Sequence, residues 1–107
     1  MANDVKGEVA FAAGDKTYTI KFSTNAICDA ENEAHKSVMA LMGEIEWLSV
    51  RRVLLWATLR PFHPEMTLKG AGDIMDAIGQ PKTIEVLTQA FNAAFPPPGE
   101  GSGSSRP

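Results

Sequence analysis

Apolar side chains recur at every second position in two short runs near the start of the chain: Val9 and Phe11, then Tyr18, Ile20 and Phe22. Alternation of this kind is typical of a half-buried β-strand. Gly14-Asp15 separates the runs, and such a pair favours a tight turn. The pattern predicts a β-hairpin over residues 7–22. Its apolar face must be covered, because an isolated hairpin is barely stable in water.

Beyond residue 22 the apolar positions recur every three or four residues, which is the spacing of one helix face. In the clearest segment Val50, Val53, Leu54 and Ala57 follow the i, i+3, i+4, i+7 rule. A later segment is predicted to bury one stripe: Ile84, Leu87, Phe91, Ala94 and Phe95. The helices are predicted to begin, in chain order, at these N-capping positions: Ser23 or Thr24, Ser37, Ser49, Thr67 and Gln80.

Helix ends and the chain's last segment complete the predicted architecture. Pro61 and Gly79 are placed to end the third and fourth helices. Residues 97–107 contain almost only Gly, Ser and Pro, so we predict a disordered tail there. The sequence therefore predicts an α+β fold in one domain over residues 1–96, an N-terminal β-hairpin followed by a bundle of four to five short helices.

Length and charge exclude several classes of function. A chain of 107 residues with a net charge of −3 and scattered Lys and Arg offers no basic surface for nucleic acid or an anionic membrane. Residues 53–59, the longest apolar stretch, are too few to span a bilayer. The single cysteine, Cys28, forms no intramolecular disulfide, which fits a reducing compartment. We expect a soluble intracellular protein.

Candidate reactive groups are few. Cys28 and His35 are seven residues apart and share a helix face, with acidic residues nearby. Structural zinc sites usually contain Cys or His pairs two to four residues apart, and this chain has none. We interpret Cys28 as a semi-buried small hydrophobe and His35 as a residue at the solvent edge. Nothing beside them resembles an oxyanion hole for a thiol nucleophile.

Two other motifs also favour a structural interpretation. Residues 69–73 (KGAGD) lack the spacing of a phosphate-binding loop, so we interpret the glycines as small residues that allow close helix packing. Asp73 and Asp76 lie one turn apart on a helix surface and fit a solvated face. We expect no enzyme activity, no catalytic residues, no cofactor and no metal.

The helical part is rich in large flexible or aromatic side chains for so small a core, with five aromatics and four methionines between residues 39 and 95. Most are expected in the core. The alternative is a core together with a groove that binds a partner helix, because aromatic and methionine side chains are enriched at such sites. The candidate partner-binding residues are Trp47, Trp56, Leu59, Phe62 and Phe91.

The order of these features resembles the tail assembly chaperone family of phages and gene transfer agents. The matching segments are residues 5–9 (VKGEV), 14–20 (GDKTYTI), 25–28 (NAIC), 55–60 (LWATLR), 63–68 (HPEMTL), 71–76 (AGDIMD) and 90–96 (AFNAAFP). They span nearly the whole predicted domain. The chain departs from the family pattern at residues 29–35, where more Leu is usual, and at Gly70, where an acidic residue is commoner.

The resemblance implies a role in assembly. Such chaperones bind the long helical tape measure protein before the tail tube polymerises around it, and they are absent from the finished tail. Some members are labelled tail tube proteins, which leaves a structural tail component as the alternative function. The implied partners are the tape measure protein or other tail proteins, with self-association also possible. An apolar groove would shield a long hydrophobic helix that otherwise aggregates.

Overall fold

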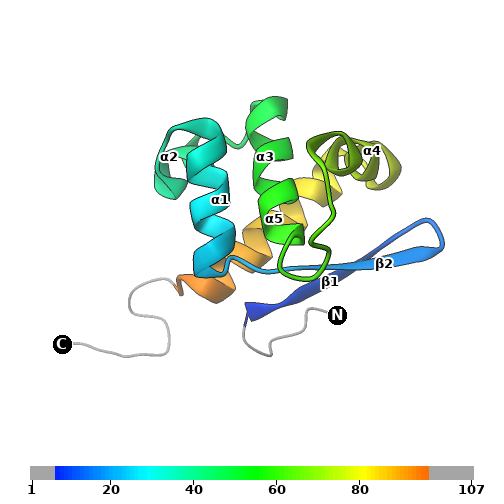
Figure 1. Cartoon of the computed structure of the whole chain (residues 1–107). Coiled ribbons are helices and arrows are strands. Elements are labelled where there is room, and N and C mark those ends of the chain that lie inside the picture. Colours follow the sequence, from blue (N-terminus) through cyan, green and yellow to red (C-terminus); the bar gives the residue numbers. More distant parts are fainter. Residues whose placement is uncertain (1–6, 97–107) are drawn as a thin grey trace.

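The computed structural model describes residues 7–96, so the predicted tail over residues 97–107 lies outside the described part. In chain order the elements are β1 (Val9–Ala13), β2 (Lys16–Ile20), α1 (Thr24–Ala34), α2 (Val38–Gly43), α3 (Leu48–Leu59), α4 (Leu68–Ile78) and α5 (Gln80–Ala94). The hairpin lies along one side of the helices (Figure 1). The predicted α+β fold, a hairpin followed by short helices, is confirmed.

The hairpin has the predicted turn and the predicted buried face. Its strands pair antiparallel with Val9 opposite Ile20 and Phe11 opposite Tyr18. Val9, Phe11 and Ile20 are buried, and the Phe11 and Tyr18 rings lie 6.0 Å apart. Gly14 turns the chain with φ 65°, a left-handed conformation that glycine adopts without a steric penalty. The apolar face therefore packs against the helices, as a two-stranded sheet requires.

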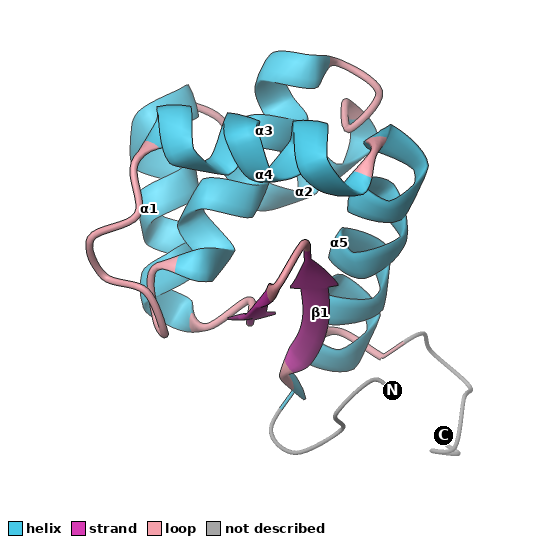
Figure 2. Cartoon of the chain, turned by 90° about the vertical axis from the view of Figure 1, so that its right-hand side faces the viewer, coloured by secondary structure: helices cyan, strands magenta, loops and turns pink. Residues whose placement is uncertain are grey.

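The free edge of β2 is bonded to the end of α3. The Lys21 N–H donates to the carbonyl of Thr58 at 3.1 Å, and the Thr19 N–H donates to Nε2 of His63 at 3.3 Å. Carbonyls in the last turn of a helix lack an intrahelical donor, so Thr58 is a suitable acceptor for a strand edge. On the other side of the hairpin, α5 runs beside β1 (Figure 2). The chain thus covers β2 near its C-terminal end and β1 beside α5, whereas Lys16 and Thr17 next to the turn are exposed.

Three predicted N-caps are confirmed by hydrogen bonds from the helix backbone. The Ser23, Ser37 and Thr67 hydroxyls accept from the N–H groups three residues later, at 3.1, 3.1 and 2.9 Å. The other two predicted caps are wrong. Helix α3 begins at Leu48 with Trp47 as its N-cap, and α5 begins at Gln80 with Gly79 as its N-cap. Neither N-cap residue makes a side-chain capping bond.

Helix α3 is the central helix of the fold. It contacts α1, α4, α5 and β2, and Leu54, Leu55 and Leu59 are fully buried in it. The predicted stripe of α3 is confirmed at Leu54 and Ala57, whereas Val50 and Val53 are only half-buried. The buried face therefore lies further around the helix than the apolar periodicity alone indicated, because α3 has neighbours on several sides.

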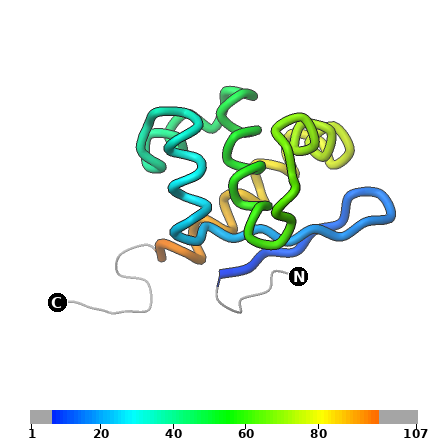
Figure 3. Tube along the Cα trace, viewed as in Figure 1, coloured from blue at the N-terminus to red at the C-terminus, as the bar shows by residue number. Residues whose placement is uncertain are grey.

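The buried face of α5 is displaced by about one residue from the face that the sequence predicted. The buried residues of α5 are Thr83, Val86, Leu87 and Ala90. Of the predicted stripe only Leu87 is buried, and Phe95 is exposed. Phe91 is half-buried, edge-on to Phe22 at 5.5 Å. The end of α5, near Phe91, lies beside the start of β1 (Figure 3). A Cβ added to Gly7, just before β1, would be 3.8 Å from the Cβ of Ala93. Because α5 packs against α3, α4 and β1 together, these three neighbours set its rotation.

The bond between His63 and Thr19 makes stability depend on pH. Nε2 accepts a hydrogen bond, so the imidazole must be neutral, and burial lowers the pKa of His63 from its ordinary value of 6.5. Because the unfolded chain binds the proton more readily, the contribution of His63 is fully present above pH 6.5 and is lost as the pH falls through the lower folded pKa. We expect wild type to lose stability over that range.

The measurement is urea denaturation between about pH 7.5 and pH 5, for wild type and His63→Gln. The glutamine amide retains an acceptor but does not titrate, so the difference between the two profiles isolates this histidine from the carboxylates. We expect wild type to lose more stability on acidification than the variant. Parallel profiles would show that His63 does not couple folding to protonation.

Candidate functional site

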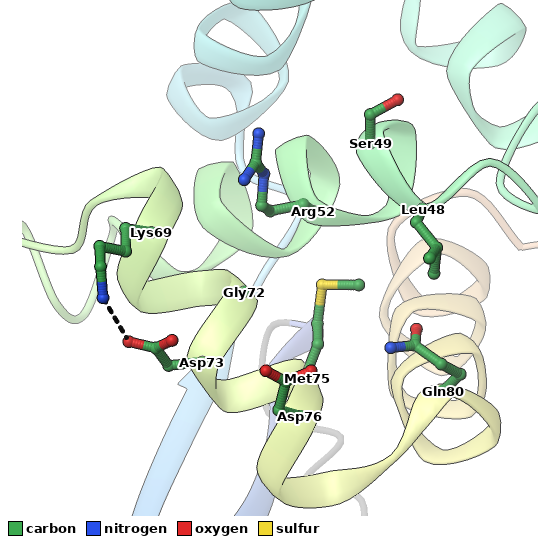
Figure 4. A pocket seen from close by; sticks show the side chains of 9 residues that line it. All are labelled: Leu48, Ser49, Arg52, Lys69, Gly72, Asp73, Met75, Asp76 and Gln80. Carbon is green, nitrogen blue, oxygen red and sulfur yellow. Dashed lines mark hydrogen bonds and ion pairs between the residues drawn. The ribbon is translucent and has the colours of Figure 1, made fainter.

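The candidate site is a depression of about 460 Å³ between α3 and α4, closed at one end by the start of α5 (Figure 4). We call it the α3–α4 groove. Its lining residues come from all three helices: Leu48, Ser49, Arg52, Lys69, Gly72, Asp73, Met75, Asp76 and Gln80. It combines an apolar floor with charged walls, which is a suitable surface for the side of an amphipathic helix.

A glycine and a methionine shape the bottom of the groove. A Cβ on Gly72 would lie 3.4 Å from Cδ of Arg52, so the aliphatic stem of that arginine occupies the space above the glycine. Met75 is buried and its side chain points toward α3 (Figure 4). The predicted packing role of the small residues in α4 thus holds at Gly72. At Gly70 the near atoms belong to Met66 and Thr67, in the segment just before the helix.

Charges of both signs border the groove. On α4, Nζ of Lys69 lies 3.4 Å from Oδ2 of Asp73, and both side chains are exposed. Asp76 follows one turn later on the same face and is also exposed, as predicted for a solvated carboxylate pair. On α3, Arg52 supplies a positive charge. Within residues 7–96, neither Arg52 nor Asp76 has an oppositely charged group within 4.0 Å.

Leu48 is exposed at the end of the groove nearest α5, and Trp47, its neighbour in the sequence, is exposed as well. Trp47 is 63% exposed and Leu48, which lines the groove, is 56% exposed. Neighbouring exposed apolar side chains beside a groove are a feature of sites where another protein binds. Tryptophan is also the residue most enriched among those that dominate binding energy. This pair makes the groove a candidate protein-binding site.

A buried arginine holds that end of the groove in place. Arg51 is only 5% exposed, and its guanidinium donates to the carbonyls of Ile45 and Glu46 at 3.0 and 3.2 Å. It also donates to Oε1 of Gln80 at 2.6 Å. The predicted capping role of Gln80 is wrong because its side chain is engaged by Arg51. The same three bonds fix the turn before α3 and the first residue of α5 around Arg51.

The five sequence-predicted partner-binding residues do not form one surface. None of the five lines the α3–α4 groove, and Trp47 is the one that precedes a lining residue, Leu48, in the sequence. Leu59 is 0% exposed, so it belongs to the core and does not reach a partner in this fold. Phe62 is 37% exposed but follows the opposite end of α3, about 18 Å along a helix of twelve residues.

The other two predicted residues have neighbours of their own. The indole Nε1 of Trp56 donates to the carbonyl of Met66 at 3.0 Å, and the guanidinium of Arg60 lies 5.1 Å from the ring. Trp56 is half-buried and anchors the segment between α3 and α4. Phe91 packs against Phe22 on one side and Phe95 on the other. Both side chains serve packing within this chain.

Sequence reasoning missed most of the residues that line the groove. Leu48 lay in a segment without clear periodicity, and Arg52 and Asp76 resembled ordinary surface charges. Their common position depends on α3 and α4 packing side by side, which no local pattern reports. The one available signal was the adjacent pair Trp47-Leu48 before a polar Ser49, since two large apolar residues at a helix start are seldom both buried.

The prediction that Cys28 is semi-buried is wrong, because the side chain is exposed. Helix α1 buries Ala26 and Ala30, and Cys28 lies on the exposed side of the helix. His35 ends α1 in a left-handed conformation, φ 60°, and its N–H donates to the carbonyl of Glu31. Across residues 7–96 no three His, Cys, Asp or Glu side chains are grouped as metal ligands. Nor is any helix in that range long and apolar enough to cross a membrane.

No family model, curated protein or solved structure matches the chain. The resemblance to tail assembly chaperones therefore stays a prediction from the sequence. The geometry of the groove is an observation that does not depend on this resemblance.

Arg51 should be far more important for stability than its neighbour Arg52. Arg51→Met keeps an apolar stem but leaves the Ile45, Glu46 and Gln80 oxygens without this donor, which should lower the free energy of unfolding by about 3 kcal/mol. The control Arg52→Met removes an exposed arginine and should change it by less than about 0.5 kcal/mol. Urea denaturation measures both. Equal effects of the two substitutions would contradict the anchoring role of Arg51.

Proposed function

We propose that this protein is a non-enzymatic assembly chaperone of a phage-type tail, which binds a helical segment of the tape measure protein in the host cytoplasm. The resemblance in sequence supplies the partner. The observation that carries the proposal in the structure is the exposed Leu48 at the end of the α3–α4 groove, with the exposed Trp47 directly before it in the sequence. These two side chains are the proposed first contacts.

The shape and chemistry of the groove favour a helix over a small molecule. Sites for small apolar ligands are concave pockets that bury most of the ligand. Here the depression is bordered by exposed charged side chains and continues onto an exposed apolar edge, with Met75 beneath. An amphipathic helix can place its apolar stripe on the exposed Leu48, with the almost fully buried Met75 beneath it, while its flanks remain hydrated.

There is also a physical reason why a tape measure protein needs such a chaperone. A tape measure protein is a long helix with more apolar surface than it can bury alone, and such surfaces aggregate. Several small chaperones bound along it would cover that surface until the tube forms. Each contact needs only modest affinity, because binding sites repeated along one chain act together.

The test is co-expression with the tape measure protein encoded by the same genetic element, followed by size-exclusion chromatography with light scattering. We expect a soluble complex of defined stoichiometry, with the tape measure protein insoluble when it is expressed alone. The absence of a complex, together with rings or tubes formed by this chain alone, would support the alternative function as a structural tail component.

Substitutions in the groove should separate binding from folding. Leu48→Glu and Trp47→Ala should each lower the affinity for the tape measure protein at least about tenfold, because they remove exposed apolar contacts. The matched control is Phe62→Ser, an exposed aromatic residue at the opposite end of α3. Melting temperatures confirm folding of all three variants. Equal loss of binding in the control would show that the groove is not the site.

A further inference from the structure

We infer that the partner helix carries a defined order of charge, with a basic flank facing α4 and an acidic flank facing α3 on either side of its apolar stripe. This inference rests on the proposed function, because it specifies the partner of the same groove. It follows from three features of the groove: the charge on each wall, the placement of those charges and the apolar path between them.

The α4 wall has an excess negative charge at its end nearest α5. Lys69 and Asp73 form an ion pair at 3.4 Å, so they largely offset each other. Asp76, one turn further along the groove, has no cationic group within 4.0 Å in residues 7–96. A helix that covers the groove removes water from this carboxylate, and a basic side chain from the partner would offset the lost hydration.

The α3 wall has the opposite sign. Arg52 rises from α3 over Gly72, and Figure 4 shows its guanidinium on the far side of the groove from Asp76. Within the described residues no carboxylate lies within 4.0 Å of the guanidinium. A partner acid placed beside Arg52 would complement it, and like charge at either wall would cost affinity.

Between the two charges lies an apolar path. Met75 forms the floor and Leu48 stands at the end of the groove (Figure 4). A helix whose apolar stripe lies on this path has one flank over each wall. Turning the helix end for end, with the same stripe facing down, exchanges its two flanks. The charges of Arg52 and Asp76 therefore also select the direction in which the helix binds, as flanking charges do in coiled coils.

The experiment uses overlapping synthetic peptides that cover the tape measure protein, with binding to the full chain measured by fluorescence anisotropy. We expect the peptides that bind to carry a basic flank and an acidic flank beside one apolar stripe. Arg52→Glu and Asp76→Lys should each weaken binding about tenfold, and the effect should shrink at about 0.5 M salt because exposed charges are screened.

A charge exchange gives the decisive comparison. The double variant Arg52→Glu/Asp76→Lys should bind the native peptide more tightly than either single variant does, because the peptide turned end for end again meets opposite charge on both walls. It should recover affinity, to within about threefold of wild type, for a peptide whose flanking charges are exchanged. The control is Glu85→Lys, which reverses an exposed carboxylate on α5 outside the groove and should leave binding unchanged.

The outcomes separate this inference from the proposed function. If Leu48→Glu abolishes peptide binding while the charge reversals have no effect, the charge order is wrong and the proposed function stands. If no peptide binds, both are overturned. If the chain self-associates and Arg52→Glu abolishes that association, a second copy occupies the groove and the inference is overturned.

Discussion

The guanidinium of Arg51 is the interaction on which the site end of the molecule depends. A group that is always charged and almost fully buried must be bonded to acceptors, or its loss of hydration would cost many kcal/mol. Here the acceptors are the carbonyls of Ile45 and Glu46 and the side-chain amide of Gln80. These acceptors belong to the turn before α3 and to the start of α5. The hydrogen bonds of one side chain therefore hold together two segments that are distant in the sequence.

Helix α3 organises the fold through both of its ends. At its N-terminal end Arg51 holds the first residue of α5, and at its C-terminal end the carbonyl of Thr58 and the ring of His63 hold β2. The hairpin and the last helix are thus attached to one central element. Between these attachments α3 meets α4 at Gly72, where the missing side chain leaves room for the aliphatic stem of Arg52 at the edge of the groove. The groove is a consequence of how the core is assembled.

How much the sequence could predict depended on how local the responsible interactions are. The hairpin follows from alternation within a few residues, and the caps at Ser23, Ser37 and Thr67 bond only three residues away. The failures at Gln80 and in the buried face of α5 involve partners far along the chain. Residue size was also a poor guide to the site, since Leu59 and Trp56 resemble Trp47 in the sequence but pack inside the fold.

Three departures from good helix design in α3 and α4 lie in the groove or next to a residue that lines it. Trp47 has no capping oxygen, which costs about 1 kcal/mol relative to serine or aspartate. Trp47 and Leu48 expose apolar surface, and Gly72 lowers helix propensity by about 1 kcal/mol relative to alanine. Departures of this kind are compatible with a binding surface, because residues selected for a partner are released from the local rules that stabilise the free chain.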